Sequence, residues 1–286
     1  MELVRLRAFA KVNYALEVQG LRDDGYHEIR TVMQSVSLAD EVEIEHAEEG
    51  FELQTEPGCS DVGPPEENTV RKAWKLMCGL VGAELPVRIR LHKRIPSRAG
   101  LGGGSADAAA ALYGINELLG LGLNHEELSD VGGWIGADVP FCLLGGTALG
   151  GGVGDLLTPL PAPPAHHLVL AMPERGVETA EIYRAYDARP RRGVASVEAV
   201  VAGLRSGDLP ALAGAIGNDL EPVTGELVPE VEAYREELLR TGALGSAMSG
   251  TGTAVYGIFG ADGAQKRPRA PFSCVCEPLD VGVEIV

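Results

Sequence analysis

The chain has 286 residues, of which 45% are hydrophobic and 23% charged, so it is long enough to bury a large core and lacks the composition of a disordered protein. Forty-one acidic residues against 24 basic ones give a net charge of −17, which argues against nucleic acid as a partner, because phosphate binding needs a basic face. The start, MELVRLRAFAKV, alternates apolar and charged residues, which is unlike a signal peptide, and no window is apolar for long enough to cross a membrane.

Five cysteines are present in odd number and without a CxxC pair: Cys59, Cys78, Cys142, Cys274 and Cys276. We interpret them as reduced thiols of a cytoplasmic protein that does not associate with membranes. A small polyanion is compatible with the acidic charge, because backbone N–H groups at a helix start hold phosphates without net positive charge.

The first third of the chain is predicted to be rich in strands. Residues 2–19 and 36–46 alternate apolar and polar side chains, which is typical of half-buried strands. A turn centred on Asp24-Gly25 lies between them, and residues 85–96 alternate again as a further strand. The remaining strands are predicted at 166–173, 254–259 and 278–286.

Helical spacing of apolar residues, or a high content of Ala and Leu, predicts the helices. They are expected at 68–81, 105–120, 125–135, 178–187, 196–206, 208–217 and 229–241. Asn68 or Thr69 is available as the N-cap of the first one. The segment 136–160 is predicted to form a loop, a strand and a glycine-rich turn.

A proline-rich piece at 159–164 is the best candidate for a domain boundary. We therefore predict a first domain over 1–160 and a second over 161–286, with the terminal strand, about 279–286, free to pack on either. A ligand site is expected in the cleft between the two domains.

The most informative stretch is PSRAGLGGGSADAAAAL, at 96–112. A flexible linker would be polar, whereas this stretch joins a predicted strand to a predicted helix. Glycines allow close approach of the backbone, and the N–H groups and dipole of the following helix favour an anion. A tight turn needed only for packing would require one glycine, not four within 100–104. The loop therefore predicts a phosphate site, although the patterns GxxxxGK[ST] and GxGxxG are both absent.

Residues 96–105 resemble the phosphate-binding loop of the GHMP kinases, the family of galactokinase, homoserine kinase and mevalonate kinase. The stretches 10–42, 136–160 and 248–259 resemble one branch of that family, the kinases of the non-mevalonate isoprenoid pathway. The similarity spans nearly the whole chain. It implies a two-domain α+β fold, with an N-terminal ribosomal-protein-like α/β domain and a C-terminal ferredoxin-like α+β domain.

The resemblance implies that the γ-phosphoryl group of ATP is transferred, with magnesium, to the 2-hydroxyl of a cytidine-diphosphate-linked methylerythritol. By similarity, Asp138 accepts the hydroxyl proton and Lys11 lies beside it. The implied ATP-binding residues are Pro96, Gly100, Leu101, Gly102, Gly103, Gly104, Ser105, Asp107, Asn68 and Lys93. No residue of the chain is assigned as a direct metal ligand.

The implied substrate-binding residues are Asn13, Tyr26, His27, Thr179 and Tyr183. Asn13 would meet the methylerythritol unit. Tyr26 and His27 would handle the cytosine by stacking and by hydrogen bonds to the base edge, with Tyr183 closing the other side.

Most of these residues have a structural alternative. Asp138, Asn68 and Thr179 could be helix caps. Lys11 and Asn13 would lie on one face of their strand and Ala10 and Val12 on the other. In the structural alternative, the face with Lys11 and Asn13 is simply exposed to solvent. Further alternatives are helix core for Tyr183, a surface histidine for His27, a solvated strand end for Lys93 and a plain turn for 249–252.

Two rival functions follow from the same residues. The first is a GHMP kinase with another alcohol acceptor, such as mevalonate or homoserine, which would leave Tyr26 and His27 without a base to contact. The second is a non-catalytic nucleic-acid module, which the net charge of −17 opposes. We expect a monomer or a weak homodimer. One departure from the family is Ser97-Arg98, where relatives often carry smaller residues.

Overall fold

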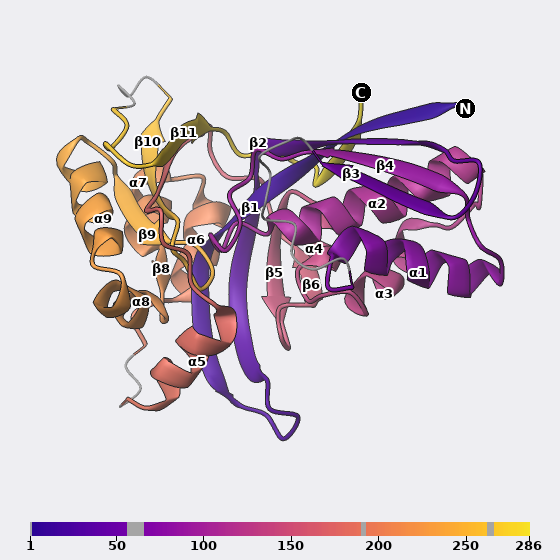
Figure 1. The fold of residues 1–286 in the computed structure, drawn as a ribbon. Helices are drawn as coiled ribbons and strands as arrows, with labels where there is room; N and C mark the ends of the chain where they lie inside the picture. Colours follow the sequence, from indigo (N-terminus) through magenta and orange to yellow (C-terminus); the bar gives the residue numbers. More distant parts are fainter. Residues whose placement is uncertain (1, 56–65, 190–192, 262–265) are drawn as a thin grey trace.

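The computed structural model describes residues 2–55, 66–189, 193–261 and 266–286, and Cys59 lies outside these ranges. The mixture of strands and helices confirms the α+β class, and the strands form two sheets (Figure 1). Among the described residues, no helix has the length and apolar character that a membrane span needs. The cysteines that are described carry free thiols.

The first sheet has the strand order β12-β1-β2-β4-β3, with β5, β6 and β8 attached. Its strands are β1 (Leu3–Leu21), β2 (His27–His46), β3 (Phe51–Thr55), β4 (Val87–His92), β5 (Thr147–Gly151), β6 (Leu156–Pro159), β8 (Gly217–Asn218) and β12 (Val283–Ile285). β1 and β2 form a long antiparallel hairpin with bulges. β12, from the far end of the sequence, pairs with β1.

The second sheet has the order β11-β7-β10-β9. Its strands are β7 (His166–Met172), β9 (Gly245–Met248), β10 (Val255–Gly260) and β11 (Phe272–Cys276). The helices of this half are α5 (Thr179–Asp187), α6 (Val197–Ser206), α7 (Leu209–Ala215), α8 (Glu221–Leu227) and α9 (Glu230–Arg240). Figure 1 shows the β1–β2 hairpin reaching down between the two halves, with its turn close to α5.

The helices α1 (Thr69–Val81), α2 (Gly103–Leu119), α3 (His125–Gly133) and α4 (Val139–Leu144) lie beside the first sheet. Asn68 is the N-cap of α1, and its side chain accepts hydrogen bonds from the N–H groups of Val70 and Arg71 at 3.0 and 3.1 Å. The alanine run of α2 is buried. A Cβ at Gly114 would come within 2.6 Å of Ile44, so α2 packs on the sheet at a distance that admits only small residues.

Most predicted elements are confirmed, but some boundaries are wrong. The helix predicted over 208–217 ends at residue 215, because Gly217–Asn218 instead pairs with β1. The short helix α4 was predicted as loop and strand, since a short apolar run such as VPFCLL does not distinguish the two. Strands β3, β9 and β11 and helix α8 were not predicted.

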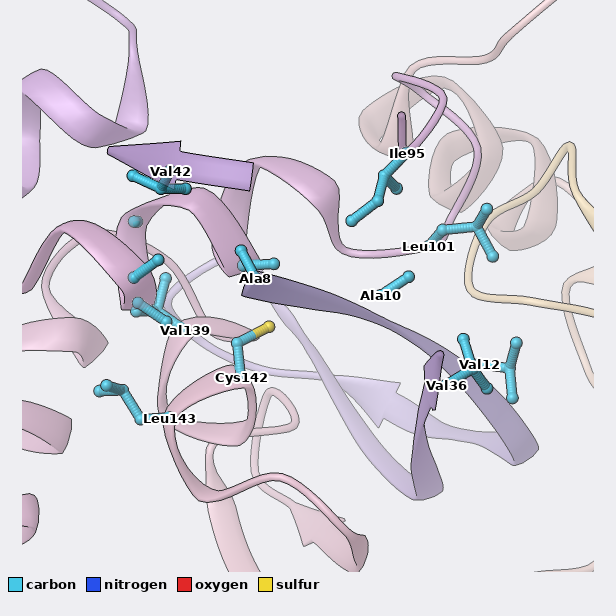
Figure 2. Close-up of a cluster of buried hydrophobic side chains, with 14 of the residues drawn as sticks. Ala8, Ala10, Val12, Val36, Val42, Ile95, Leu101, Val139, Cys142 and Leu143 are labelled. Carbon is cyan, nitrogen blue, oxygen red and sulfur yellow. The ribbon is translucent and has the colours of Figure 1, made fainter. Parts of the chain in front are cut away.

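One face of β1 is fixed by the core. Figure 2 shows Ala8, Ala10 and Val12 along this strand, near Leu101 of the glycine segment and Val139 at the start of α4. All five side chains are at most 1% exposed. The intervening residues of β1 must therefore point to the other side of the sheet.

That other side is covered by the second half of the chain. β8 runs parallel to β1, with Ala15 opposite Gly217. The Tyr256 hydroxyl, from β10, donates to the carbonyl of Asn13 at 2.8 Å. Lys11 and Asn13, on this second face, are only 4% and 3% exposed, so β1 is buried on both faces at this level. The division into domains 1–160 and 161–286 stays a prediction.

Candidate active site

The glycine loop turns the chain from β4 into α2 and leaves the start of that helix open. Gly100 and Gly102 have φ angles of 74° and 71°, in the region that favours glycine. Gly102 is the N-cap of α2 and, having no side chain, makes no capping hydrogen bond. The first N–H groups of α2 therefore have no partner within the helix, and with the helix dipole they form a site for an anion.

Two distant segments hold this loop in place. The hydroxyl of Ser249 donates to the carbonyl of Gly100 at 2.8 Å. The backbone N–H of Lys11, in β1, donates to the carbonyl of Leu101 at 3.0 Å. The anion site is thus fixed by parts of the chain that come both before and long after it.

Lys11 and Asp138 form an ion pair beside the loop. Lys11 Nζ lies 3.4 Å from Asp138 Oδ2. The side-chain carbons of Lys11 also pack close to Gly102, since a Cβ placed on that glycine would lie 3.0 to 3.8 Å from them. Asp138 is at the N-cap position of α4 but makes no capping hydrogen bond with its side chain, so the helix-cap alternative is wrong. The Asp138 side chain is 36% exposed and that of Lys11 5%, which leaves the carboxylate accessible to a ligand.

Asn13 connects Lys11 to the rest of the site. Its Oδ1 accepts hydrogen bonds from Lys11 Nζ at 2.8 Å and from the backbone N–H of Gly250 at 3.0 Å. Its Nδ2 donates to the hydroxyl of Thr31 at 2.8 Å. Lys11 and Asn13 are only 4% and 3% exposed, so the solvent-face alternative is wrong for both.

Lys93 lies under the loop, between two carboxylates. Its Nζ donates to Asp107 Oδ2 at 2.5 Å and also to Asp40, whose other oxygen accepts from the N–H of Ile95 at 2.8 Å. Burial alone would lower the pKa of Lys93, but the charges of Asp107 and Asp40 raise it. The solvated-lysine alternative is therefore wrong, and the first turn of α2 is tied to β2 and β4.

Asp107 shares this one ammonium with Asp40. Asp107 is 4% exposed, and its Oδ1 has no hydrogen-bond partner among the described residues. Burial raises the pKa of Asp107 to about 7, in spite of the lowering effect of Lys93. Lys93 thus stays charged, and Asp107 takes up a proton at a higher pH than an ordinary Asp does.

This proton uptake predicts a pH-dependent stability. An Asp in the unfolded chain has a pKa of about 3.9, so folding raises the pKa, and the stabilising contribution is lost as pH rises from about 4 through about 7. Asp107→Asn should remove on the order of 2 kcal/mol from the difference in unfolding free energy between about pH 5 and about pH 8. Denaturant titrations of both proteins at the two pH values measure this, and the same pH difference in both would contradict it.

One cavity of about 850 Å³, called the cleft below, brings most of the predicted residues together. The predicted residues that line it are Lys11, Asn13, Tyr26, His27, Lys93, Pro96, Gly100, Leu101, Gly102, Gly103, Gly104, Ser105, Asp138, Thr179 and Tyr183. Asn68 and Asp107 do not line it. A smaller hollow of about 400 Å³ between β1, β2 and β11 is lined by no predicted site residue. We therefore take the cleft as the candidate active site.

At the other end of the cleft the aromatic residues are arranged differently from the prediction. His27 does not face Tyr183 across a gap, because the two rings stack directly, with centroids 4.5 Å apart and planes inclined by 22°. The Nε2 atom of His27 lies 2.9 Å from Asp187 Oδ1. Tyr26 is 66% exposed, and its ring is therefore open to a ligand. Burial raises the pKa of Tyr183 well above its ordinary value.

Thr179 is not a helix cap, since the N-cap of α5 is Glu178. Its hydroxyl lies 3.4 Å from that of Thr251, where α5 meets the turn of residues 249–252. Glu178 Oε1 lies 3.1 Å from a guanidinium nitrogen of Arg98, which ties α5 to the start of the glycine loop. Arg98 has a φ of 53°, unusual for a residue with a side chain.

Thr31, Asp40 and Asp187 contact predicted site residues but were not themselves predicted. A signal for Asp40 was present, because it occupies the apolar phase of the strand pattern set by Val36 and Val42. A carboxylate at an inward position is rarely buried without partners. Thr31 and Asp187 had no such signal.

Family models agree with this site. The model described as GHMP kinases N terminal domain matches residues 68–146, and that described as GHMP kinases C terminal matches residues 200–273. Together, the fold and the open glycine loop define a GHMP kinase.

Individual relatives narrow the class. A 4-diphosphocytidyl-2-C-methyl-D-erythritol kinase of Moorella thermoacetica is 44% identical over 274 residues, covering 93% of each chain. The crystal structure of a 4-(cytidine 5'-diphospho)-2C-methyl-D-erythritol kinase has a TM-score of 0.76 and 34% identity, covering 96% of this chain and 98% of its own. The chain belongs to the 4-diphosphocytidyl-2-C-methyl-D-erythritol kinase family. A homoserine kinase structure from Cytophaga hutchinsonii has a TM-score of 0.78 at 24% identity, covering 100% of this chain and 98% of its own, and shares the fold.

Proposed function

We propose that this protein transfers the γ-phosphoryl group of ATP to the 2-hydroxyl of 4-diphosphocytidyl-2-C-methyl-D-erythritol. The observation that supports this most directly is the Lys11–Asp138 pair beside an open helix start, in a cleft that also contains exposed and stacked aromatic rings. The 44% identity to a kinase of that name over most of the chain agrees with it.

In the proposed reaction, the N–H groups of Gly103, Gly104 and Ser105 bind the phosphates of ATP. The substrate hydroxyl oxygen forms a bond to the γ-phosphorus as the bond to the β,γ-bridging oxygen breaks, which leaves ADP. Asp138 accepts the proton of the hydroxyl, and Lys11 stabilises the negative charge around the transferred group. Asn13 acts through Lys11, because its Oδ1 fixes the position of the ammonium.

Magnesium is compatible with these residues. It prefers oxygen ligands and is held by one or two carboxylates together with substrate phosphates. Because Asp138 would accept the proton, the protein oxygen would come instead from the hydroxyl of Ser105, which lines the same cleft. In the described residues no group of three or more His, Cys, Asp and Glu side chains could hold a metal alone, so the ATP phosphates would supply the remaining ligands. Its chemical contribution would be to neutralise charge on the transferred phosphoryl group.

The other end of the cleft would hold the cytidine part of the substrate. Tyr26, with its open ring, would stack on the base, and His27 and Tyr183 would form the wall beside it. Pro96 and Lys93, which follow β4 and line the cleft, would support the nucleotide, whereas the Asn68 side chain caps α1 and does not line the cleft. A cytoplasmic location and a monomeric or weakly dimeric state belong to the same proposal.

A transfer assay with ATP labelled in the γ position tests the function. The cytidine-linked methylerythritol, mevalonate and homoserine are offered separately, and we expect label to move only to the first. The reason is that the other two carry no base for Tyr26 and His27. Transfer to mevalonate or homoserine but not to the cytidine compound would overturn the proposed substrate, and binding of RNA in a filter assay would favour the non-catalytic rival.

A further inference from the structure

The ring of His27 makes one hydrogen bond within the described part of the chain, and it does so through Nε2. Nε2 lies 2.9 Å from Asp187 Oδ1, whereas no hydrogen bond from Nδ1 to the described residues is found. The side chain is only 7% exposed and stacks on Tyr183. Its ring is thus held in one orientation at the wall of the cleft.

Helix α5 provides both contacts to this ring. Tyr183 and Asp187 are four residues apart, so they lie on the same face of the helix, and both line the cleft. Tyr183 stacks on the imidazole face while Asp187 contacts its edge. The end of α5 therefore determines where the His27 ring lies and which nitrogen it presents.

A carboxylate next to Nε2 determines the tautomer of a neutral imidazole, that is, which of the two ring nitrogens carries the hydrogen. An ionised carboxylate only accepts hydrogen bonds, so it favours the form with the hydrogen on Nε2. In neutral imidazole the other nitrogen then carries a lone pair and is an acceptor. Nδ1 of His27 is therefore suited to an N–H donor and not to a carbonyl oxygen.

We propose that Asp187 is a specificity-determining positioning residue, which holds His27 as a hydrogen-bond acceptor and so selects a pyrimidine that carries an exocyclic amino group. Cytosine has an amino group at the position where uracil has a carbonyl oxygen. A uracil carbonyl facing Nδ1 would require the hydrogen to move from Nε2, which would leave the Asp187 carboxylate facing a lone pair. This inference rests on the proposed function, because it assumes that the cleft binds a cytidine compound.

The test compares kcat/KM for the cytidine-linked substrate and for the same compound with uridine in its place. In Asp187→Ala the carboxylate is gone, and either tautomer of His27 becomes accessible at similar cost. We expect the preference for the cytidine compound to fall by about 10- to 100-fold. An unchanged ratio would overturn the proposal, even if both rates fall together.

Two controls separate this effect from misfolding and from loss of charge. Glu181→Ala removes the same charge from α5 at a residue outside the cleft lining, and it should keep the wild-type ratio. In a His27→Gln background, Asp187→Ala should no longer change the ratio, because its effect acts through the imidazole; a further change there would contradict the proposal. Failure of wild-type protein to phosphorylate the cytidine compound would instead reject the proposed function.

Discussion

Asp138→Asn is expected to lower kcat by about 1,000-fold, within the range that positioned general bases contribute, while ATP still binds. The carboxylate is the group next to Lys11 that is accessible to a substrate hydroxyl, and an amide of the same shape cannot accept its proton. The glycine loop is held by Ser249 and Lys11, so the phosphate site should stay intact. Single-turnover kinetics together with calorimetric titration of ATP separate the two effects.

A matched control is Asp130→Asn. It makes the same chemical change on an exposed residue of α3, outside the cleft lining, and kcat should stay close to that of the wild type. If Asp138→Asn turned over at a near-normal rate, Asp138 would not be the proton acceptor. If ATP binding were lost as well, the residue would instead be needed to form the nucleotide site.

Gly100→Ala is expected to destabilise the fold by about 3 kcal/mol, since it combines a left-handed φ with overpacking, and to abolish most of the activity. Gly100 has a φ of 74°, and a Cβ there would lie 2.0 Å from the carbonyl oxygen of Ser249. Rotation of a side chain cannot relieve this contact, because both partners are backbone. The turn of residues 249–252 must move, and the hydrogen bond from the Ser249 hydroxyl to Gly100 would be lost. Thermal and urea unfolding of the purified protein measure the change.

The neighbouring Gly104→Ala provides the comparison. Gly104 lies in the first turn of α2 with an ordinary helical φ, and a Cβ there would meet only the side chain of Thr69, at 3.6 Å. Alanine is favoured over glycine within a helix by about 1 kcal/mol. This variant should therefore be at least as stable as the wild type. Equal destabilisation of both variants would show that the close contact at Gly100 is not the cause of the lost stability.

The sequence predicted much of the phosphate end of the site. The strand, glycine turn and helix are contiguous, so local pattern alone indicates an anion site there. The alternation of β1 indicates that Lys11 and Asn13 share a face, but not what covers that face. The cover comes from Gly250 and Tyr256, more than two hundred residues later, and no local pattern contains that information.

The base end of the site was predicted less completely. The resemblance to the GHMP kinases indicated that Tyr26, His27 and Tyr183 bind the base, but it did not indicate how the three side chains lie relative to one another. The direct stack and the contact to Asp187 depend on how α5 meets the β1–β2 hairpin. Asp187 is the last residue of an amphipathic helix, where an exposed carboxylate is common, so its sequence context alone gives no reason to choose it.

The pairing of β1 with β12 has a consequence for how the protein is made. On the edge of β1 that faces away from β2, Leu6, Arg7 and Ala8 pair with Ile285, Glu284 and Val283, and Lys11 contacts the glycine loop about ninety residues downstream. Pairings between such distant segments form slowly, because the loop-closure entropy must be overcome before the contact stabilises the chain. During synthesis the edge of β1 at residues 6–8 therefore stays unpaired until β12 has been made, and an unpaired strand edge can pair wrongly with other segments.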